Sequence, residues 1–464
     1  VTIGASGVSS SIAGIPFYLA DTSIYTHDVS GTDNSASQNT AYGIEALDAI
    51  TTGDGNTAIG RGSSSGITTG TRNVALGRAS LDSPDTENDN LAIGYNALAG
   101  TIAGGEYNVA IGNYSLDALT SGDRNIAVGY SAASAITTGD NNTIIGEQAG
   151  LALTEGSGNV AVGREALKNE DAHGLNTAIG TEALFTQNAG ANAYNTAVGY
   201  RAGSSVTTGV QNTIIGGLAG DALTDSDYNV AIGYQALSGD TLGSRSVAIG
   251  RRALATQNFT SATTAYNTAI GYTAGEAITT GQNNTLIGAL AGDAMTTAGS
   301  SVAVGRDALG SVTEGGENVG IGYGALRDTT TGSQNLAVGY LALEENISGT
   351  RNVAVGFQAL ENPDTENDNT AIGYEALGGA IAGGEFNVAV GNYSLDALTS
   401  SDKSTAVGYN AGTAVTTAAQ ITALGAFACQ SVTTGGNNIG IGYNANGGSN
   451  DETNNLGIGV DALT

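Results

Sequence analysis

The stretch that decides the fold is Asn369-Thr370-Ala371-Ile372-Gly373-Tyr374, one copy of a pattern that recurs along most of the chain. The 464 residues contain 25 copies of Asn-(Thr/Val)-Ala-(Ile/Val)-Gly, with some substitutions, from Asn39 to Asn455. Most copies begin 17 residues after the previous one. A single array of repeats therefore spans residues 39–464, and residues 1–38 form a separate N-terminal segment. We number each repeat from its asparagine, so that Gly373 occupies position 5.

The pattern of one repeat is that of a short strand followed by a corner. Seventeen residues are too few for a repeat of two helices. Positions 2 and 4 are usually β-branched and point to one face of a strand, whereas position 3 points to the other. Position 5 is Gly in all 25 copies and permits a corner with positive φ. The sequence thus predicts an all-β fold, a parallel β-solenoid of about 25 coils and on the order of 120 Å in length.

Small residues suit a thin core between the opposing sheets of a narrow coil. The chain has 72 Gly and no Trp, and only 5% of its residues are aromatic. Backbone ladders between neighbouring coils would then supply most of the stability. The asparagine at position 1 either forms a ladder of side-chain amides along the solenoid or simply tolerates a turn. Alanine at position 3 suggests the close approach of another sheet or subunit, and hence self-association.

Charge and composition exclude several classes of function. The chain has 43 acidic and 14 basic residues and a net charge of −29, so we expect neither nucleic acid nor membrane insertion among its interactions. Cys429 is the only cysteine and is expected to be a small buried hydrophobe. His27 and His173 are too few and too far apart to indicate a triad or a histidine-rich metal site. We therefore expect no enzyme, no catalytic residues and no cofactor other than calcium. A glycan-degrading solenoid enzyme with paired carboxylates is a weaker alternative.

Two duplicated acidic turns are candidate calcium sites, because calcium prefers oxygen ligands. Solvated loops without a metal are the alternative interpretation. The carboxylates alternate along each turn: Asp85, Glu87 and Asp89, and again Asp364, Glu366 and Asp368.

Position 6 predicts an aromatic stripe on the surface. It is Arg in five copies and Tyr in ten: Tyr95, Tyr130, Tyr200, Tyr234, Tyr272, Tyr323, Tyr340, Tyr374, Tyr409 and Tyr443. Such a stripe could stack on host-surface glycans or pack against a neighbouring rod. Alternatively, it only seals a corner of each coil.

The N-terminal segment 1–38 lacks the repeat and carries its own apolar residues. These are the candidate assembly residues Ile15, Phe17, Tyr18, Leu19, Ile24 and Tyr25. The segment either docks onto the end of another subunit, which would give a head-to-tail filament, or caps its own solenoid.

Phrases such as Ser246-Val247-Ala248-Ile249-Gly250 resemble two related families. One comprises the NTAIGY-type repeat arrays of phage tail-fibre-like and bacterial surface proteins, which also share the Thr-Thr-Gly corner. The other comprises the head repeats of trimeric autotransporter adhesins. The resemblance covers residues 39–464 and implies a left-handed solenoid and trimers as one form of self-association.

These observations together predict a structural subunit of an extracellular or cell-surface fibre with an adhesive role. A phage tail-fibre shaft that presents a receptor-binding tip on the virion is the alternative. The expected partners are further copies of the chain, with host-surface glycans or proteins as adhesion targets.

Overall fold

The computed structural model describes residues 10–12, 15–20, 23–26, 34–448 and 451–464, and these residues form short β-strands and turns. They include no helix, and so no helical segment that could cross a bilayer. The chain divides into two compact units, Val1–Asn229 and Val230–Thr464. Each unit is a parallel β-solenoid, and the two together hold about 25 turns spaced about 17 residues apart. The predicted fold class is therefore confirmed.

The strands of the first unit are β1 (Ser10–Ile12), β2 (Ile15–Ala20), β3 (Ser23–Tyr25), β4 (Thr40–Tyr42), β5 (Thr57–Ile59), β6 (Val74–Leu76), β7 (Leu91–Ile93), β8 (Val109–Ile111), β9 (Ile126–Val128), β10 (Thr143–Ile145), β11 (Val160–Val162), β12 (Thr177–Ile179), β13 (Thr196–Val198) and β14 (Thr213–Ile215).

The strands of the second unit are β15 (Val230–Ile232), β16 (Gly243–Ser244), β17 (Val247–Ile249), β18 (Thr263–Thr264), β19 (Thr268–Ile270), β20 (Thr285–Ile287), β21 (Val302–Val304), β22 (Val319–Ile321), β23 (Leu336–Val338), β24 (Val353–Val355), β25 (Thr370–Ile372), β26 (Val388–Val390), β27 (Thr405–Val407), β28 (Thr422–Leu424), β29 (Ile439–Ile441) and β30 (Leu456–Ile458).

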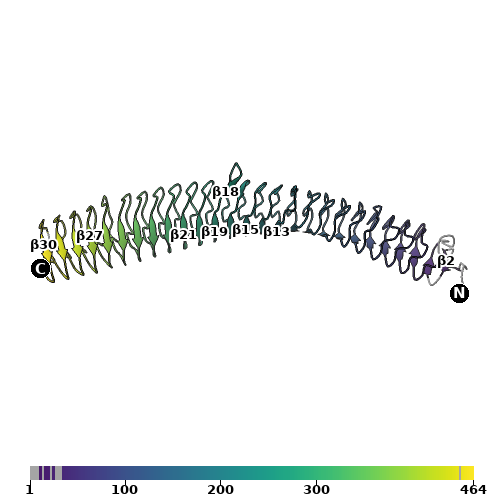
Figure 1. The fold of residues 1–464 in the computed structure, drawn as a ribbon, viewed down its shortest axis with the longest axis horizontal. Coiled ribbons are helices and arrows are strands. Elements are labelled where there is room, and N and C mark those ends of the chain that lie inside the picture. Colours follow the sequence, from purple (N-terminus) through teal and green to yellow (C-terminus); the bar gives the residue numbers. More distant parts are fainter. Residues whose placement is uncertain (1–9, 13–14, 21–22, 27–33, 449–450) are drawn as a thin grey trace. The chain divides into compact units, whose positions relative to one another are not determined.

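Each repeat contributes one strand, at positions 2 to 4, to a parallel sheet along one side of its unit (Figure 1). The register is that of the repeat, since Thr370 lies opposite Val388 and Ala371 opposite Ala389. The other positions form turns, which also bond from coil to coil, as when Thr51 N–H donates to Thr68 O at 2.9 Å. The expectation of opposing sheets is therefore wrong. The wall across from the sheet consists of stacked turns.

The longest insertion in the array adds a second, small sheet. It lies in the coil at 246–266, in the second unit, where β18 pairs in parallel with β16 of the preceding coil. The loop with β18 projects from the row of coils in Figure 1. The main sheet keeps its register at this point, because β17 still pairs with β19.

The core of each coil is formed by its own small and aliphatic side chains. Ala371, Ala376 and Leu377, at positions 3, 8 and 9, are fully buried. Position 3 points inward, and a Cβ built at Gly320 would lie 3.0 Å from the Ala325 carbonyl oxygen. The space at position 3 is thus filled within the same coil, by Ala in most copies and by a larger residue such as Ile144 where position 9 is glycine, as at Gly150. The interpretation of position 3 as a contact with another subunit is wrong.

The invariant glycine of position 5 is confirmed as a corner that only glycine can occupy. Gly129 has φ of 142°, and a Cβ built there would lie 2.4 Å from the carbonyl oxygen of Gly146 in the next coil. Position 5 residues therefore stack backbone against backbone along each unit.

The N-terminal segment contributes a strand to the sheet of the first unit. β3 pairs in parallel with β4, with Ile24 opposite Thr40 and Tyr25 opposite Ala41. On its other side β3 pairs with β2 in antiparallel fashion. The change from parallel to antiparallel pairing occurs at β3, before the first repeat.

Candidate interaction surfaces and a buried polar cluster

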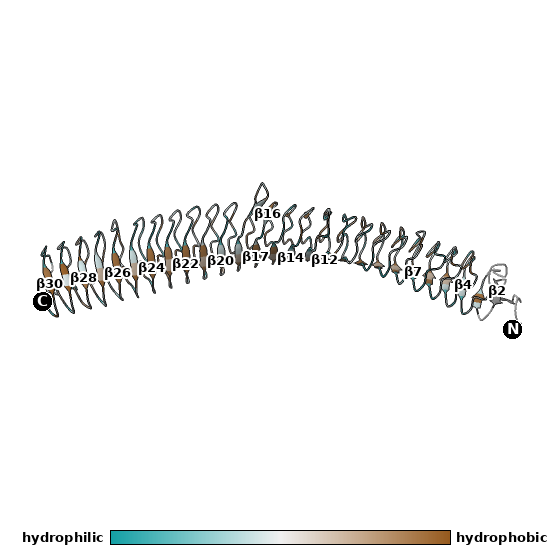
Figure 2. Cartoon of the chain, in the orientation of Figure 1, coloured by the Kyte–Doolittle hydropathy of each residue, from teal (hydrophilic) through white to brown (hydrophobic). Residues whose placement is uncertain are grey.

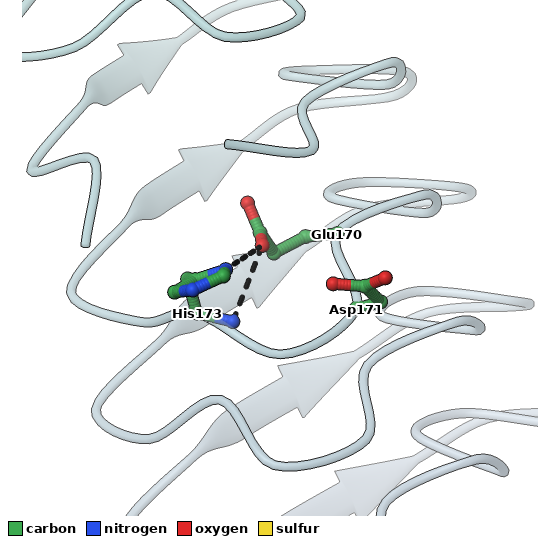
Figure 3. Close-up of side chains that lie close together, drawn as sticks. All are labelled: Glu170, Asp171 and His173. Carbon is green, nitrogen blue, oxygen red and sulfur yellow. Dashed lines mark hydrogen bonds and ion pairs between the residues drawn. The ribbon is translucent and has the colours of Figure 1, made fainter. Parts of the chain in front are cut away.

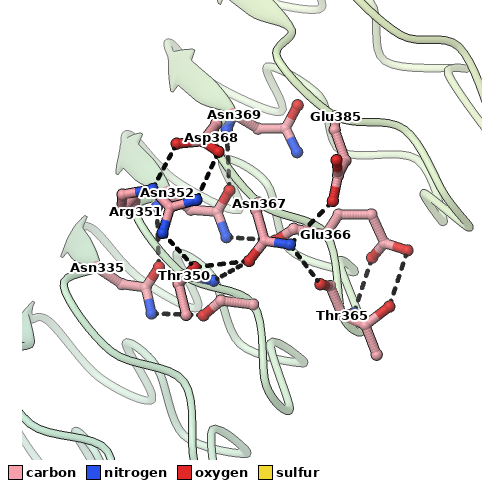
Figure 4. A network of polar contacts seen from close by, with 11 residues as sticks. Asn335, Thr350, Arg351, Asn352, Thr365, Glu366, Asn367, Asp368, Asn369 and Glu385 are labelled. Atoms are coloured by element: carbon pink, nitrogen blue, oxygen red, sulfur yellow. Dashed lines mark hydrogen bonds and ion pairs between the residues drawn. The ribbon is translucent and has the colours of Figure 1, made fainter.

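The asparagines of position 1 form the predicted ladder inside each unit. Asn142 donates its backbone N–H to the Asn125 side-chain oxygen at 3.1 Å, and its own amide nitrogen donates to the Gly156 carbonyl at 2.9 Å. The same pattern links Asn335, Asn352 and Asn369 in the second unit (Figure 4). Each buried amide therefore hydrogen-bonds within its own coil and to the next coil. Asparagine at position 1 is thus a structural hydrogen-bonding residue and does more than tolerate a turn conformation.

The outward face of the sheet is uncharged and partly exposed, with threonine or an aliphatic residue at position 2 and an aliphatic residue at position 4 in all copies but the first. Positions 2 and 4 point away from the core, and none of these positions carries a charged residue in any of the 25 copies. Ile145 and Ile179 of the first unit are each 38% exposed, and Ile287 and Ile372 of the second unit 39% and 40%. Many of the strands accordingly have the hydrophobic colour in Figure 2. In a chain with a net charge of −29, the face formed by positions 2 and 4, here called the strand face, is the notable uncharged surface.

The glutamates of the two acidic turns are buried and held by backbone amides. Glu87 accepts N–H groups of Asp85 and Thr86 at 2.8 and 3.0 Å and of Gly104 in the next coil at 2.9 Å. Its duplicate, Glu366, has the equivalent three contacts at 2.7 to 2.9 Å. These carboxylates stabilise their own turns.

The aspartates that end the same turns are paired with arginines. Arg351 binds Asp368 through two nitrogens, at 2.7 and 2.8 Å (Figure 4). The Arg72–Asp89 pair has the same geometry, and the hydrogen bond from each arginine lowers the pKa of its aspartate. The remaining aspartates, Asp85 and Asp364, are exposed. The structure thus gives the carboxylates of each turn separate partners and does not bring them together as one ligand set; calcium binding there stays a prediction.

The tyrosines of position 6 lie on the surface and belong to longer rows of rings. Two rows occur, with adjacent ring centroids 5.1 to 6.2 Å apart: Tyr95, Tyr114 and Tyr130 in the first unit, and Tyr323, Tyr340, Phe357, Tyr374, Tyr393, Tyr409, Phe427 and Tyr443 in the second. Tyr200, Tyr234 and Tyr272 are exposed outside these rows. The rings from Tyr323 to Tyr374 are stacked face to face, whereas the other neighbouring rings meet edge to face.

Sequence reasoning missed four members of these rows. Phe357 lies at position 6, and Tyr114, Tyr393 and Phe427 lie at position 7. A search for an aromatic residue at either position would have found all four. Position 6 arginines join the stripe in the same way, since Arg251 lies 5.5 Å from the ring centroid of Tyr272.

The candidate assembly residues are described only in part. Ile24 is 45% exposed, whereas Tyr25 is buried and its hydroxyl lies 3.5 Å from the Asn39 amide nitrogen. Tyr25 therefore belongs to the core below the first repeat. Ile15, Phe17, Tyr18 and Leu19 lie in β2, and their side chains are outside the described part of the structure. The docking role of the segment stays a prediction.

A polar cluster around the buried Glu170 interrupts the core of the first unit (Figure 3). Glu170, Asp171 and His173 follow β11, and their candidate ligand atoms lie within 4.8 Å of one another. Among the described residues this is the one group of three or more potential metal ligands. The Glu170 side chain is fully buried. One of its oxygens accepts a hydrogen bond from the backbone N–H of His173 at 3.3 Å and lies 3.8 Å from the ring nitrogen Nδ1 of the same residue. Burial raises the pKa of Glu170 to about 7.

The sequence analysis did not predict this cluster, because its residues match no known metal-binding motif. Its signal is a departure from the repeat: Glu170 occupies position 12, where other coils have residues such as Leu153, and His173 occupies position 15, where they have residues such as Gly156. Cys429, in contrast, is buried as predicted, and burial raises the pKa of its thiol to about 11.

A second buried carboxylate at position 12 provides a comparison. Asp240 of the second unit accepts N–H groups from Gly243 and Phe259, at 3.0 and 3.2 Å, and the Gln257 amide at 2.5 Å. Burial raises the pKa of Asp240 as well. The core of this repeat therefore accommodates a carboxylate by surrounding it with donors.

No protein-family model matches the chain, and no curated protein sequence is similar to it.

Proposed function

We propose that the protein is a structural subunit of an extracellular, adhesive fibre, and that its copies associate with one another along the strand face. The coarse part of this proposal follows from the β-solenoid fold, which is suited to a fibre-like subunit. Extracellular location, adhesion and self-association are the further steps.

The observation that carries the proposal is the absence of charge from the strand face. Two copies of a chain with a net charge of −29 repel each other at most orientations. Contact between two strand faces brings no like charges into direct opposition, and it removes aliphatic side chains that are about two fifths exposed from water. If each coil contributes roughly 40 to 50 Å² of this face, the 25 coils together offer on the order of 1,000 Å² per chain, which is enough for a stable protein–protein interface.

The stacked part of the aromatic row in the second unit, Tyr323 to Tyr374, favours glycan binding less. Sugars stack on the open faces of aromatic rings, whereas Tyr340 and Phe357 are stacked against their neighbours at interplanar angles of 13° or less. These stacked rings are better suited to sealing the corner of each coil, so we assign adhesion to the assembled fibre and not to them.

The test adds charge to the strand face and measures the state of association. In the second unit Ile287→Glu, Ile321→Glu and Ile372→Glu would be combined. The matched control places the same three charges on exposed turn positions: Thr280→Glu, Thr297→Glu and Thr331→Glu.

Sedimentation of the purified proteins at micromolar concentration is expected to show oligomers for the unmodified chain and the control, and monomers for the strand-face variant. Circular dichroism would verify that all three are folded. Monomers of the unmodified chain, or an unchanged oligomer in the strand-face variant, would refute self-association by this face. Immunogold electron microscopy of the source cells would test location, and label on virions in place of cell-attached fibres would favour the tail-fibre alternative.

A further inference from the structure

We propose that Glu170, Asp171 and His173 bind a divalent first-row transition-metal ion, such as Zn²⁺, which fixes this coil of the first unit. The proposal is independent of the fibre function. It depends on the geometry of the cluster and on buried polar atoms that have no hydrogen-bond partner among the described residues.

The first observation is that one oxygen of the buried Glu170 carboxylate has no hydrogen-bond partner among the described residues. Like Glu170 Oε2, the buried His173 Nδ1 has no hydrogen-bond partner in the described part of the chain. In the next coil, Asn176 Nδ2 and Gln187 Nε2 are also buried without a partner. Four of the unpartnered buried polar atoms in the described residues therefore fall in one short segment, and the Glu170 side chain among them is completely shielded from solvent.

The other buried carboxylates of the described residues do have partners, so an unpartnered buried carboxylate oxygen is not a general feature of this fold. Glu87 and Glu366 are held by backbone amides, Asp240 by amides and Gln257, and Glu344 by Arg327. Each has the donors or the cation that a buried carboxylate requires. Glu170 has backbone contacts, of which the one from the His173 N–H is 3.3 Å long, but its Oε2 has none. The basic group beside it is His173, because the nearby Lys168 binds Glu165 and Gln148 instead.

The comparison between Asp240 and Glu170 is close, because both occupy position 12 and both are followed by a glutamine at position 12 of the next coil. Gln257 donates to Asp240, whereas Gln187 Nε2 donates to no group. The site around Glu170 thus has the polar composition of its counterpart, but the acceptor Glu170 Oε2 and the donor Gln187 Nε2 do not pair with each other.

The kind of metal ion is inferred from the chemistry of the three candidate ligands. Two carboxylates and one neutral imidazole suit Zn²⁺ and related transition ions, whereas Mg²⁺ and Ca²⁺ prefer oxygen ligands alone. Asp171 and His173 are only partly buried, which gives an ion access from the surface. The ligands lie at positions 12, 13 and 15 of one coil, so a bound ion would tie its last turn together. This is the arrangement of a structural site.

The repeat itself supplies variants that should fold. Glu170→Leu restores the kind of residue found at position 12 of the preceding coil, and His173→Gly restores the glycine of position 15. Asp171→Asn changes the partly exposed ligand without altering the core. As a control, Asp89→Asn removes a carboxylate from an acidic turn and leaves the cluster intact.

The experiment is calorimetric titration of the metal-stripped full chain with Zn²⁺ in an excess of Mg²⁺, which occupies weak acidic sites on the surface. We expect one equivalent of Zn²⁺ per chain for the unmodified protein and the control, accompanied by a higher melting temperature. Glu170→Leu, His173→Gly and Asp171→Asn should each bind Zn²⁺ at least about tenfold more weakly. Absence of saturable binding in the unmodified chain, or undiminished binding in the Leu and Gly variants, would overturn the proposal.

Discussion

At the scale of one residue, Gly129 illustrates the limit that close stacking sets on side chains. Gly129→Ala would place a methyl group 2.4 Å from the Gly146 carbonyl oxygen and require φ of 142° from an L-residue. We expect a loss of roughly 2 to 4 kcal/mol in the free energy of unfolding, measured by denaturant titration. Gly190→Ala is the control, because its Cβ would have no atom within 4 Å. An equal effect of both substitutions would contradict the stacking argument.

The asparagine ladder gives a second prediction at this scale. Asn125→Ala would leave the buried Asn142 N–H and the Gly139 carbonyl without their partners. We expect it to lower the free energy of unfolding by about 2 to 4 kcal/mol. Asn125→Ser should cost less, because Ser301 occupies position 1 naturally and its hydroxyl accepts the Asn318 N–H at 3.3 Å. Thermal unfolding of both variants would measure the difference, and equal losses would argue against a hydrogen-bonding role.

Residue patterns predicted the ladder and the glycine corner but not the other corners. Leu47 and Glu45 adopt positive φ, of 54° and 62°, at positions 9 and 7, where only a minority of the copies have glycine, such as Gly150 and Gly62. Local preference alone disfavours these conformations. They persist because bonds to the next coil hold them, as Leu47 N–H does with Ser63 O at 3.1 Å. These backbone conformations depend on contacts between coils, so they could not be predicted from the sequence of a single repeat.

At the scale of one element, the coil has one sheet and a wall of turns. The alternation at positions 2 to 4 was enough to predict the strand, but the inward direction of position 3 could not be derived from it, since both faces carry apolar residues. The Glu170 cluster was equally hidden. It consists of residues that depart from the repeat, and the sequence alone does not show whether such residues are buried or lie close together.

The coil that contains Asp240 predicts a pH dependence of stability. Burial raises the folded-state pKa of Asp240 above its ordinary value of 3.8, so the folded state holds a proton more tightly than the unfolded state. The stability from this group is complete below pH 3.8 and is lost as pH rises through the folded-state pKa. We expect the free energy of unfolding of the unmodified chain to fall, relative to Asp240→Asn, as pH rises above about 4. Parallel profiles for the two proteins in chemical denaturation would show that Asp240 is not perturbed.

At the scale of the whole molecule, a net charge of −29 and an uncharged strand face have opposite effects on association. Salt weakens the repulsion and leaves the apolar contact in place. Raising ionic strength from about 0.01 M to 0.15 M shortens the screening length from roughly 30 to 8 Å. We therefore expect light scattering to show stronger association of the unmodified chain at higher salt. Dissociation on adding salt would indicate contacts made by ion pairs instead.

The bonding of each coil to the next one also determines how the chain reaches its native state. The donor and acceptor of a bond between coils are about 17 residues apart, as in the pair Thr51 N–H and Thr68 O, within a chain of 464 residues. The ratio of these numbers, about 0.04, is below that of fast-folding helical bundles. No distant segments have to meet before structure forms. We expect the protein to fold progressively during its synthesis, each new coil adding to the edge left by the coil before it.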